Sequence, residues 1–280
     1  MRGRAAVFEA NRINIVVAHP AEAKPLCAMF NLRAIAVSSP FRLFGNDAGV
    51  SLIVSGMGKV VAASATAYLA GLQAAFPTSV WLNIGIAGHR TAAIGTGLLA
   101  HKITDAATGS SFYPPQLVRS QPTSEIISVD SPEQNYAQNA AYDMEAAGFY
   151  ASASRVATIE LVHAFKVISD NPQQPIAAFD ISQVDGLISS QRNRLEELLR
   201  DLDALLENYR SAYALPEEYV KLLNKYQYTT TQKLQLKRLC ERYHALEIEA
   251  DLKKFSQDAF GTTKQLLSAM QMHIAQQVKI

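Results

Sequence analysis

The sequence predicts an α/β fold, in which a mixed, largely parallel twisted sheet is flanked by helices and followed by an all-helical C-terminal extension. Up to about residue 180, short apolar runs rich in small and β-branched residues alternate with glycine-rich turns, a pattern typical of buried strands. Beyond that point Leu, Gln, Lys and Glu predominate, and only Gly186, Pro216 and Gly261 interrupt them as helix breakers. This change of composition separates a region of strands and helices from a purely helical one.

Six apolar runs are expected to form the strands of the sheet. A helix is expected over residues 59–75, between the second and the third run, because this stretch is rich in alanine and holds no breaker other than Gly71. A strand, a helix and a strand at this spacing imply right-handed crossovers between parallel strands. The expected strands are 13–18, 51–54, 80–84, 97–100, 126–129 and, as the longest, about 160–168.

The C-terminal part of the chain has the pattern of amphipathic helices. Leucines at the i, i+3, i+4 spacing predict a long helix over residues 184–209, packed along the core. Three more helices are expected, one after Pro216, one over about 231–258 and one after Gly261. The chain is therefore expected to divide into a ragged extension (1–11), an α/β domain (12–210) and a helical extension (211–280).

Length and composition exclude several classes of protein. With 280 residues, 49% hydrophobic and 18% charged, the chain can bury a substantial core and is not disordered. The net charge of +1 gives no reason to expect nucleic-acid binding, and the basic cluster Lys237, Arg238 and Arg242 is interpreted as a solvated helical face. No apolar run reaches the roughly 18 residues of a membrane span. Cys27 and Cys240 are too few for a disulfide framework, so a cytoplasmic location is expected.

Two acidic motifs 25 residues apart carry the main functional signal. The first is Asp143-Met144-Glu145, and the second is Ser169-Asp170 at the end of an apolar run. Each is interpreted as placing a carboxylate where a buried strand gives way to the next element, which is where open α/β sheets bind their ligands. The pair resembles the ribose-binding Met-Glu and the purine-binding Ser-Asp of the family of purine nucleoside phosphorylases and methylthioadenosine/S-adenosylhomocysteine nucleosidases.

Two glycine-bearing turns agree with this resemblance. The segment Ser55–Val60 follows a strand and opens a helix, as a very similar Ser-Gly-x-Gly-Lys-Val does in the nucleosidases, although a tight turn with close helix packing would also account for it. A dinucleotide fingerprint is not favoured, because its third glycine would fall at Val61. The segment 83–88 resembles the turn in which main-chain groups of the family meet the nucleoside, which implies substrate contacts at Ala87 and Gly88.

The resemblance implies a role for each carboxylate. Glu145 would accept hydrogen bonds from the ribose hydroxyls and favour the ribosyl cation, while Met144 packs under the sugar. Asp170 would act as the general acid at the purine N7, oriented by Ser169. Glu22, just past the first strand, would activate the attacking water. By themselves these acids also fit an acidic helix start at Glu145, a capped loop at Asp170 and a first helical turn at Glu22.

The segment expected to contact the purine is less complete. Ile127 and Val129 stand at the strand end whose backbone contacts the base in the family. Pro132 occupies the place of a stacking aromatic residue, and the stretch 130–145 is shorter than in the family. Tyr113 is the candidate for the missing stacking surface, although an aromatic residue packed on a surface turn is equally consistent with the sequence.

Water rather than phosphate is the expected nucleophile. The phosphorylases carry a basic residue in the third strand and a serine in the turn that follows, where this chain has Asn83 and Ile86. A phosphate dianion needs charge-assisted hydrogen-bond donors, and these two side chains do not supply them.

We therefore expect a nucleosidase that cleaves the N-glycosidic bond of an adenine-type purine nucleoside with water, and that uses neither a cofactor nor a metal. The resemblance also implies a homodimer or a higher homo-oligomer. Two alternatives remain open from the sequence. One is a phosphate-dependent purine nucleoside phosphorylase, and the other is a non-catalytic nucleoside-binding module whose helical tail docks a partner.

Overall fold

The computed structural model describes residues 12–73 and 78–277. The chain divides into two compact units, Met1–Leu206 and Glu207–Ile280, which we call the α/β unit and the helical unit. Helix α5 (Arg192–Ala212) contains the boundary between them. The extension expected over residues 1–11 lies outside the described residues.

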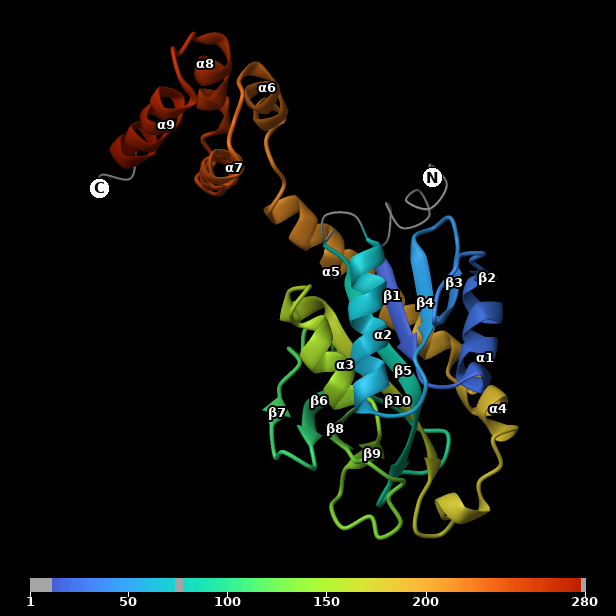
Figure 1. Ribbon diagram of the computed structural model, residues 1–280. Coiled ribbons are helices and arrows are strands. Elements are labelled where there is room, and N and C mark those ends of the chain that lie inside the picture. The colour runs from blue at the N-terminus through green and yellow to red at the C-terminus, as the bar shows by residue number, and fades with distance from the viewer. Residues whose placement is uncertain (1–11, 74–77, 278–280) are drawn as a thin grey trace. The chain divides into compact units, whose positions relative to one another are not determined.

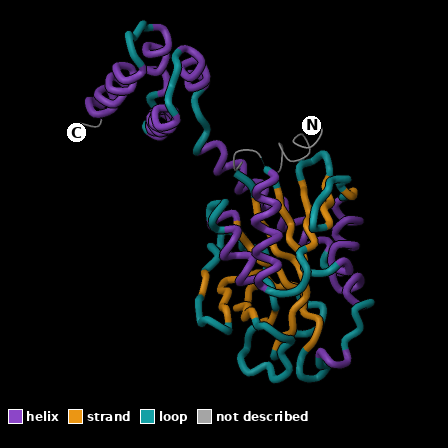
Figure 2. The backbone as a smooth tube through the Cα atoms, viewed as in Figure 1, coloured by secondary structure: helices purple, strands orange, loops and turns teal. Residues whose placement is uncertain are grey.

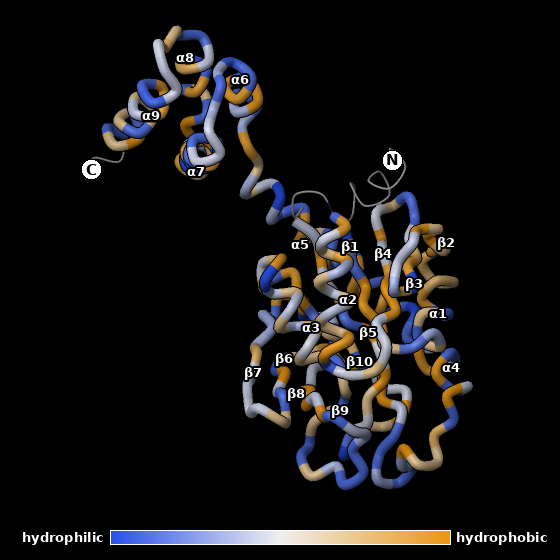
Figure 3. The backbone as a smooth tube through the Cα atoms, viewed as in Figure 1, coloured by the Kyte–Doolittle hydropathy of each residue, from blue (hydrophilic) through white to orange (hydrophobic). Residues whose placement is uncertain are grey.

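The centre of the α/β unit is a set of parallel strands. Strand β1 (Ile13–Val17) pairs in parallel with β4 (Val50–Val54) on one side and with β5 (Val80–His89) on the other. β5 pairs in parallel with β10 (Val162–Asp170), as can be followed in Figure 1. Helix α2 (Lys59–Leu72) connects β4 to β5, so the expected strand–helix–strand crossover is present. These strands form the hydrophobic centre of the unit in Figure 3.

The sheet closes on itself, which the sequence did not predict. β10 pairs with β5 and also, antiparallel, with β6 (Gly97–Asp105). From β6, parallel pairings lead to β8 (Thr123–Ser128) and then to β9 (Ala141–Asp143), and β9 returns to β5 in antiparallel pairing. The α/β class is thus confirmed, but the sheet is less parallel than expected. A short buried apolar run does not reveal its pairing partners, so the sequence pattern could not show this closure.

Two further features of the sheet differ from the expectation. Residues 85–88, expected to form a turn, continue β5 up to His89 because they pair with β10 and β9. Short antiparallel strands also extend the edges of the sheet. They are β2 (Arg33–Ala34) and β3 (Arg42–Gly45) beside β4, and β7 (Ser111–Phe112) beside β6.

Helices α2 and α3 (Ala146–Ala153) pack together against the sheet. A side chain at Gly148 of α3 would collide with the backbone carbonyl of Lys59, so glycine permits this close approach. Apolar side chains of both helices form one core with residues of β1, β5 and β10. This packing holds the start of α3 close to the strand ends that surround the site described below.

The remaining helices of the α/β unit also differ from the expectation. The single helix expected over 184–209 is two helices, α4 (Gln183–Ser190) and α5, which are separated at Gln191. α4 packs against α1 (Pro20–Phe30), the helix that follows β1. In the described part of the chain, no helix combines the length and the apolar character that crossing a membrane requires.

The helical unit has an apolar core of its own. Over its described residues 207–277 Figure 2 shows helices and loops but no strand. Each helix contributes buried side chains to the core, for example Leu222 and Met270. The single helix expected over 231–258 is instead two helices, and the turn between them contains Glu247, whose φ is positive at 56°. The helices are α6 (Glu217–Lys225), α7 (Thr230–Ala245), α8 (Leu252–Gln257) and α9 (Thr263–Gln277).

Candidate active site

One cavity of the α/β unit gathers the three acids singled out in the sequence. It has a volume of about 210 Å³ and is lined by residues at the carboxyl ends of β1, β5 and β10. Glu22 of α1, Glu145 at the start of α3 and Asp170 at the end of β10 all line it. These side chains are far apart in the sequence. The parallel pairing of β1 and β10 with β5 brings Glu22 and Asp170 to the same edge of the sheet, whereas Glu145 reaches the cavity from β9, which runs antiparallel to the end of β5.

Most of the other residues expected to bind substrate line the same cavity, whereas Ile127 and Tyr113 do not. Ile127 is buried in a cluster with Tyr136 and Tyr142. Tyr113 is 67% exposed and follows β7 at the edge of the sheet. The expectation that Tyr113 supplies a stacking surface is therefore wrong for this cavity. The expected residues that do line it are Ala87, Gly88, Val129, Met144 and Ser169.

Aromatic and apolar side chains that the sequence did not reveal complete the cavity wall. Tyr142 of β9 and Phe179, in the segment that follows β10, provide the aromatic surfaces that Tyr113 does not. Met57 and Ile181 add apolar surface. Phe179 is the first aromatic residue after Asp170 in the sequence. That position alone does not predict that it lines the cavity, because this depends on the path of the loop.

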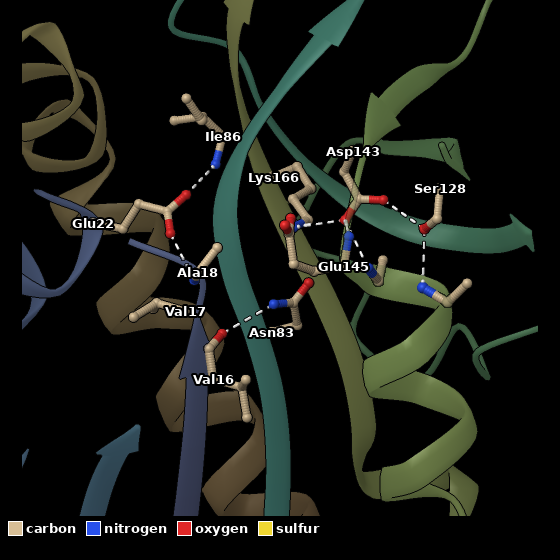
Figure 4. Close-up of polar contacts among 12 residues, drawn as sticks. Val16, Val17, Ala18, Glu22, Asn83, Ile86, Ser128, Asp143, Glu145 and Lys166 are labelled. Carbon is tan, nitrogen blue, oxygen red and sulfur yellow. Dashed lines mark hydrogen bonds and ion pairs between the residues drawn. The ribbon is translucent and has the colours of Figure 1, made fainter. Parts of the chain in front are cut away.

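Glu22 is held by three main-chain N–H groups. Its Oε2 accepts hydrogen bonds from Ala18 at 2.8 Å and from His19 at 2.9 Å. Its Oε1 accepts one from Ile86 at 3.1 Å, and Figure 4 shows the contacts with Ala18 and Ile86. Gly85 leaves room for this side chain, since a Cβ there would lie 2.8 Å from Oε1. Ile86 thus contributes its main chain, and Oε1 of Glu22 retains a lone pair for a further donor such as water.

Lys166 of β10 is a buried cation at this site that the sequence did not assign a role. Its Nζ lies 2.8 Å from Asp143 Oδ2, and the exposed fractions of the two side chains are 1% and 0%. Burial lowers the pKa of this lysine, but Asp143, Glu145 and Glu22 outweigh burial and raise that pKa above its ordinary value. The ammonium group therefore stays charged. The sequence signal that could have revealed this role is the position of a lysine inside an apolar run, because a buried lysine almost always has a charged partner.

Asp143 anchors the start of α3. Its Oδ1 accepts a hydrogen bond from Ser128 Oγ at 2.6 Å, and its Oδ2 accepts one from the N–H of Ala146 at 2.7 Å. Ser128 Oγ in turn accepts a hydrogen bond from the N–H of Ala147 at 2.9 Å, as Figure 4 shows. Together with the ion pair to Lys166, these contacts fix the chain immediately before and after Glu145.

Glu145 is buried in the cavity wall, and its protonation is perturbed. Its side chain accepts a hydrogen bond from the N–H of Gly58 at 2.7 Å. Burial raises the pKa of Glu145 to about 7, against the opposing effect of Lys166 and the Gly58 N–H. The carboxylates of Asp143 and Glu22 add to the rise. This carboxyl group therefore titrates near neutral pH.

Asp170 is 3% exposed, and both of its oxygens accept hydrogen bonds from hydroxyl groups. Ser169 Oγ lies 2.5 Å from Oδ1, and the hydroxyl of Tyr136 donates to Oδ2. The contact with Ser169 agrees with the sequence-based expectation, whereas nothing in the sequence indicated the contact with Tyr136. A side chain at Gly88 would collide with both Asp170 and Tyr136, so glycine is required there.

Comparisons with known proteins were informative only at the level of structure. No family model matches the chain, and no curated protein matches it. The 5′-methylthioadenosine nucleosidase of Arabidopsis thaliana has a TM-score of 0.58 and 18% identity, over 69% of this chain and 96% of that chain. The 5′-methylthioadenosine/S-adenosylhomocysteine nucleosidase of Helicobacter pylori has a TM-score of 0.57 and 13% identity, over 69% and 99%. Futalosine hydrolase of Helicobacter pylori has a TM-score of 0.57 and 14% identity, over 69% and 98%.

These likenesses define the class of fold. The chain has the fold that these nucleosidases and futalosine hydrolase share. The resemblance drawn from the acidic motifs is thereby confirmed for the fold. Activity and substrate are argued from the residues of the cavity, because a shared fold does not by itself define a function.

Proposed function

We propose that the α/β unit hydrolyses the N-glycosidic bond of an adenine-type purine nucleoside. The convergence of Glu22, Glu145 and Asp170 on one cavity carries this proposal. Cleavage of a glycosidic bond by water uses an acid at the leaving group and a base for the water on the opposite face of the sugar. The fold shared with nucleosidases of known structure supports the same reading.

The sugar is assigned to Glu145 and Met144. A carboxylate accepts two donors at once, so Glu145 suits the 2′- and 3′-hydroxyls of ribose. Its negative charge also stabilises the ribosyl cation that develops as the bond breaks. Met144 lines the same cavity and offers an apolar surface to the sugar ring.

The purine is assigned to the wall that contains Asp170. As the general acid, Asp170 delivers a proton to N7 of the purine, so that the base takes the electron pair of the broken bond and leaves as a neutral molecule. Ala87, Gly88 and Val129 line the cavity and are assigned to the edge of the purine. Phe179 provides an aromatic face for stacking.

Charge at the site favours water over phosphate as the nucleophile. The buried ammonium group of Lys166 faces three carboxylates, so the four groups carry a net charge of −2 (+1 − 3) when all are ionised. A phosphate dianion would be repelled by this surplus of negative charge. A neutral water molecule is not repelled, and Oε1 of Glu22 can accept its proton as it attacks the sugar.

Asn83, which stands where the phosphorylases have a basic residue, also fits the assignment of water as the nucleophile. Asn83 Nδ2 donates to the carbonyl of Val16 at 3.0 Å, and Asn83 does not line the cavity. Ile86 lines the cavity with an apolar side chain. Neither side chain can donate a hydrogen bond to a phosphate in the cavity.

The apolar part of the cavity favours a substrate with an uncharged 5′ substituent. Met57 and Ile181 line this part. Burying an apolar substituent against such a surface contributes roughly 25 cal/mol for each Å² removed from water. We therefore expect 5′-thioether adenine nucleosides to be cleaved more efficiently than unsubstituted ones.

The proposal includes a homodimer or higher homo-oligomer, which the resemblance implies, and a cytoplasmic location, which the small number of cysteines favours. Cys27 and Cys240 are free thiols, which suits a reducing compartment. Multi-angle light scattering of the purified full chain measures the oligomeric state directly.

The test is base release from a panel of purine nucleosides, with and without a 5′ thioether and with and without phosphate. We expect release of adenine that does not depend on phosphate. Asp170→Asn and Glu22→Gln should each lower the rate by roughly 10²- to 10⁴-fold. Asp185→Asn and Glu196→Gln make the same chemical changes outside the cavity and should leave the rate unchanged.

Other outcomes would replace the proposal with one of its rivals. Strict dependence on phosphate would indicate a phosphorylase. Tight binding of adenine nucleosides without release of base would indicate a nucleoside-binding module. Full rates in both Asp170→Asn and Glu22→Gln would show that the acid and the base are assigned to the wrong residues.

A further inference from the structure

The segment between β8 and β9 directs one side chain onto the proposed general acid. Tyr136 lies in this segment, is 2% exposed and has a positive φ of 46°. Its hydroxyl donates to Oδ2 of Asp170. A non-glycine residue at positive φ costs free energy, so the surrounding contacts must hold it in place.

Those contacts come from both sides of Tyr136. Oε1 of Glu133 accepts hydrogen bonds from the N–H groups of Gln134 at 2.9 Å and Asn135 at 2.6 Å. Immediately after Tyr136, the carbonyl of Ala137 accepts a hydrogen bond from Nη1 of Arg90 at 2.6 Å. The turn is therefore fixed at both ends, and the phenol is aimed at Asp170 before any ligand arrives.

Tyr136 acts on Asp170 from behind the cavity wall. Asp170 lines the cavity, whereas Tyr136 does not. Burial raises the pKa of Tyr136 above its ordinary value, and the hydrogen bond to Asp170 adds to the rise. The phenol consequently stays protonated and serves as a hydrogen-bond donor to the carboxyl group.

Ser169 differs from Tyr136 because it has a choice of acceptor. Its Oγ lies 2.5 Å from Oδ1 of Asp170 and 3.3 Å from the carbonyl of Ala87. A hydroxyl carries one proton, so it can donate to only one of these acceptors at a time. When Asp170 is ionised, Ser169 donates to Oδ1. When Asp170 is protonated there, the carboxyl O–H donates to Ser169 Oγ, and the serine proton turns to Ala87.

We propose that Tyr136 is a positioning residue that stabilises the carboxylate which Asp170 becomes as it gives its proton to the purine. This rests on the function proposed above. The proton moves from Asp170 to N7 as the C1′–N9 electron pair moves into the base, and water adds to C1′ while its proton passes to Glu22. A hydrogen bond to a charged acceptor is stronger than one to a neutral acceptor. The Tyr136 bond therefore gains strength in the transition state, which is the condition for lowering the barrier.

The test is the pH dependence of kcat and KM for Tyr136→Phe in the full chain. Without the phenol O–H, we expect kcat to fall by roughly 10- to 100-fold, as loss of a hydrogen bond to a charged group implies. We also expect the alkaline limb of the profile to move to higher pH, because the carboxyl group then keeps its proton longer. KM should change much less than kcat.

Two further variants separate this role from packing. Replacement of Tyr136 by 3-fluorotyrosine keeps the ring and makes the hydroxyl a stronger donor, so the alkaline limb should move to lower pH. Tyr150→Phe removes the hydroxyl of another buried tyrosine of the α/β unit, which does not contact Asp170, and should leave kcat and the pH profile unchanged.

Failure of the inference is distinct from failure of the proposed function. If the unaltered protein releases base and Tyr136→Phe lowers kcat without moving the alkaline limb, Tyr136 is a packing residue and the inference is overturned. An unchanged kcat in Tyr136→Phe would overturn it as well. If the unaltered protein releases no base from any nucleoside, the proposed function is overturned, and this inference falls with it.

Discussion

The two units of the chain bury different kinds of residue. The α/β unit buries the side chains of Glu22, Asp143, Glu145, Lys166 and Asp170, each with at most 7% exposure. The core of the helical unit is formed by apolar side chains together with a cysteine and a tyrosine. Among its described residues, Glu218 is the charged side chain with the least exposure, at 8%, and it pairs with Lys221 at 2.9 Å.

This difference indicates where the chemistry of the protein lies. Removing a charged group from water costs several kcal/mol unless partners compensate for it. A cluster of buried carboxylates around one lysine is therefore an expensive arrangement that stability alone does not explain. The core of the helical unit, by contrast, is of the kind that apolar burial alone stabilises.

The largest expected effect comes from removing the shared cation of the α/β unit. Lys166→Met would leave Asp143, Glu145 and Glu22 buried without their counter-charge. Breaking a buried ion pair in this way costs about 3–5 kcal/mol. We expect the free energy of unfolding, measured by urea denaturation at pH 7.5, to fall by that amount.

The matched control is Lys24→Met, which breaks an exposed ion pair. Lys24 Nζ lies 2.7 Å from Asp185, and the lysine side chain is 78% exposed. Exposed pairs contribute little to stability, so the urea midpoint should hardly move. Equal losses in the two variants would remove the distinction between the buried cluster and ordinary surface charges.

A smaller loss of stability, confined to the other unit, should follow from a cavity in the helical core. Leu236 of α7 is fully buried there, and Leu236→Ala should destabilise the helical unit by about 2–5 kcal/mol. Because the candidate site lies in the α/β unit, kcat/KM for base release below the unfolding transition should be unchanged. A parallel loss of kcat/KM would mean that the helical unit takes part in the reaction.

The most gradual expected effect is a pH dependence of stability that arises from Glu145. Its pKa rises from 4.5 to about 7 on folding, so the folded state binds this proton more tightly than the unfolded state does. The stability contributed by that proton is fully present below about pH 4.5 and is lost as the pH rises through 7. Over this interval the free energy of unfolding should fall by at most roughly 1.4 kcal/mol per pH unit.

Glu145→Gln removes the titrating group and should remove this slope. Urea denaturation of both proteins at several pH values between 4.5 and 8 provides the comparison. As the pH rises, the unaltered protein should steadily lose stability relative to Glu145→Gln. A constant difference would show that Glu145 is ionised throughout this range.

Some site residues could be predicted from the sequence because each follows a recognisable local pattern. Asp170 stands at the end of an apolar run, Glu145 stands in the acidic motif that begins at Asp143, and Glu22 stands in the first turn of a helix after a strand. Tyr136 and Phe179 lie in irregular segments, whose paths depend on contacts made far away in the sequence. The choice of Tyr113 as a stacking surface failed for the same reason, because an aromatic residue in an irregular segment does not show where that segment runs, and Tyr113 does not line the cavity.

The class of fold, most of the strands and the acidic motifs could be predicted from the sequence, because these depend on residue type and spacing over a few neighbouring positions. Three features became visible only in the folded chain: the sheet closes between β10 and β6, one lysine lies among three carboxylates, and a tyrosine donates a hydrogen bond to Asp170. Each of these depends on contacts between distant segments, and periodicity along a chain carries no information about which distant segments meet.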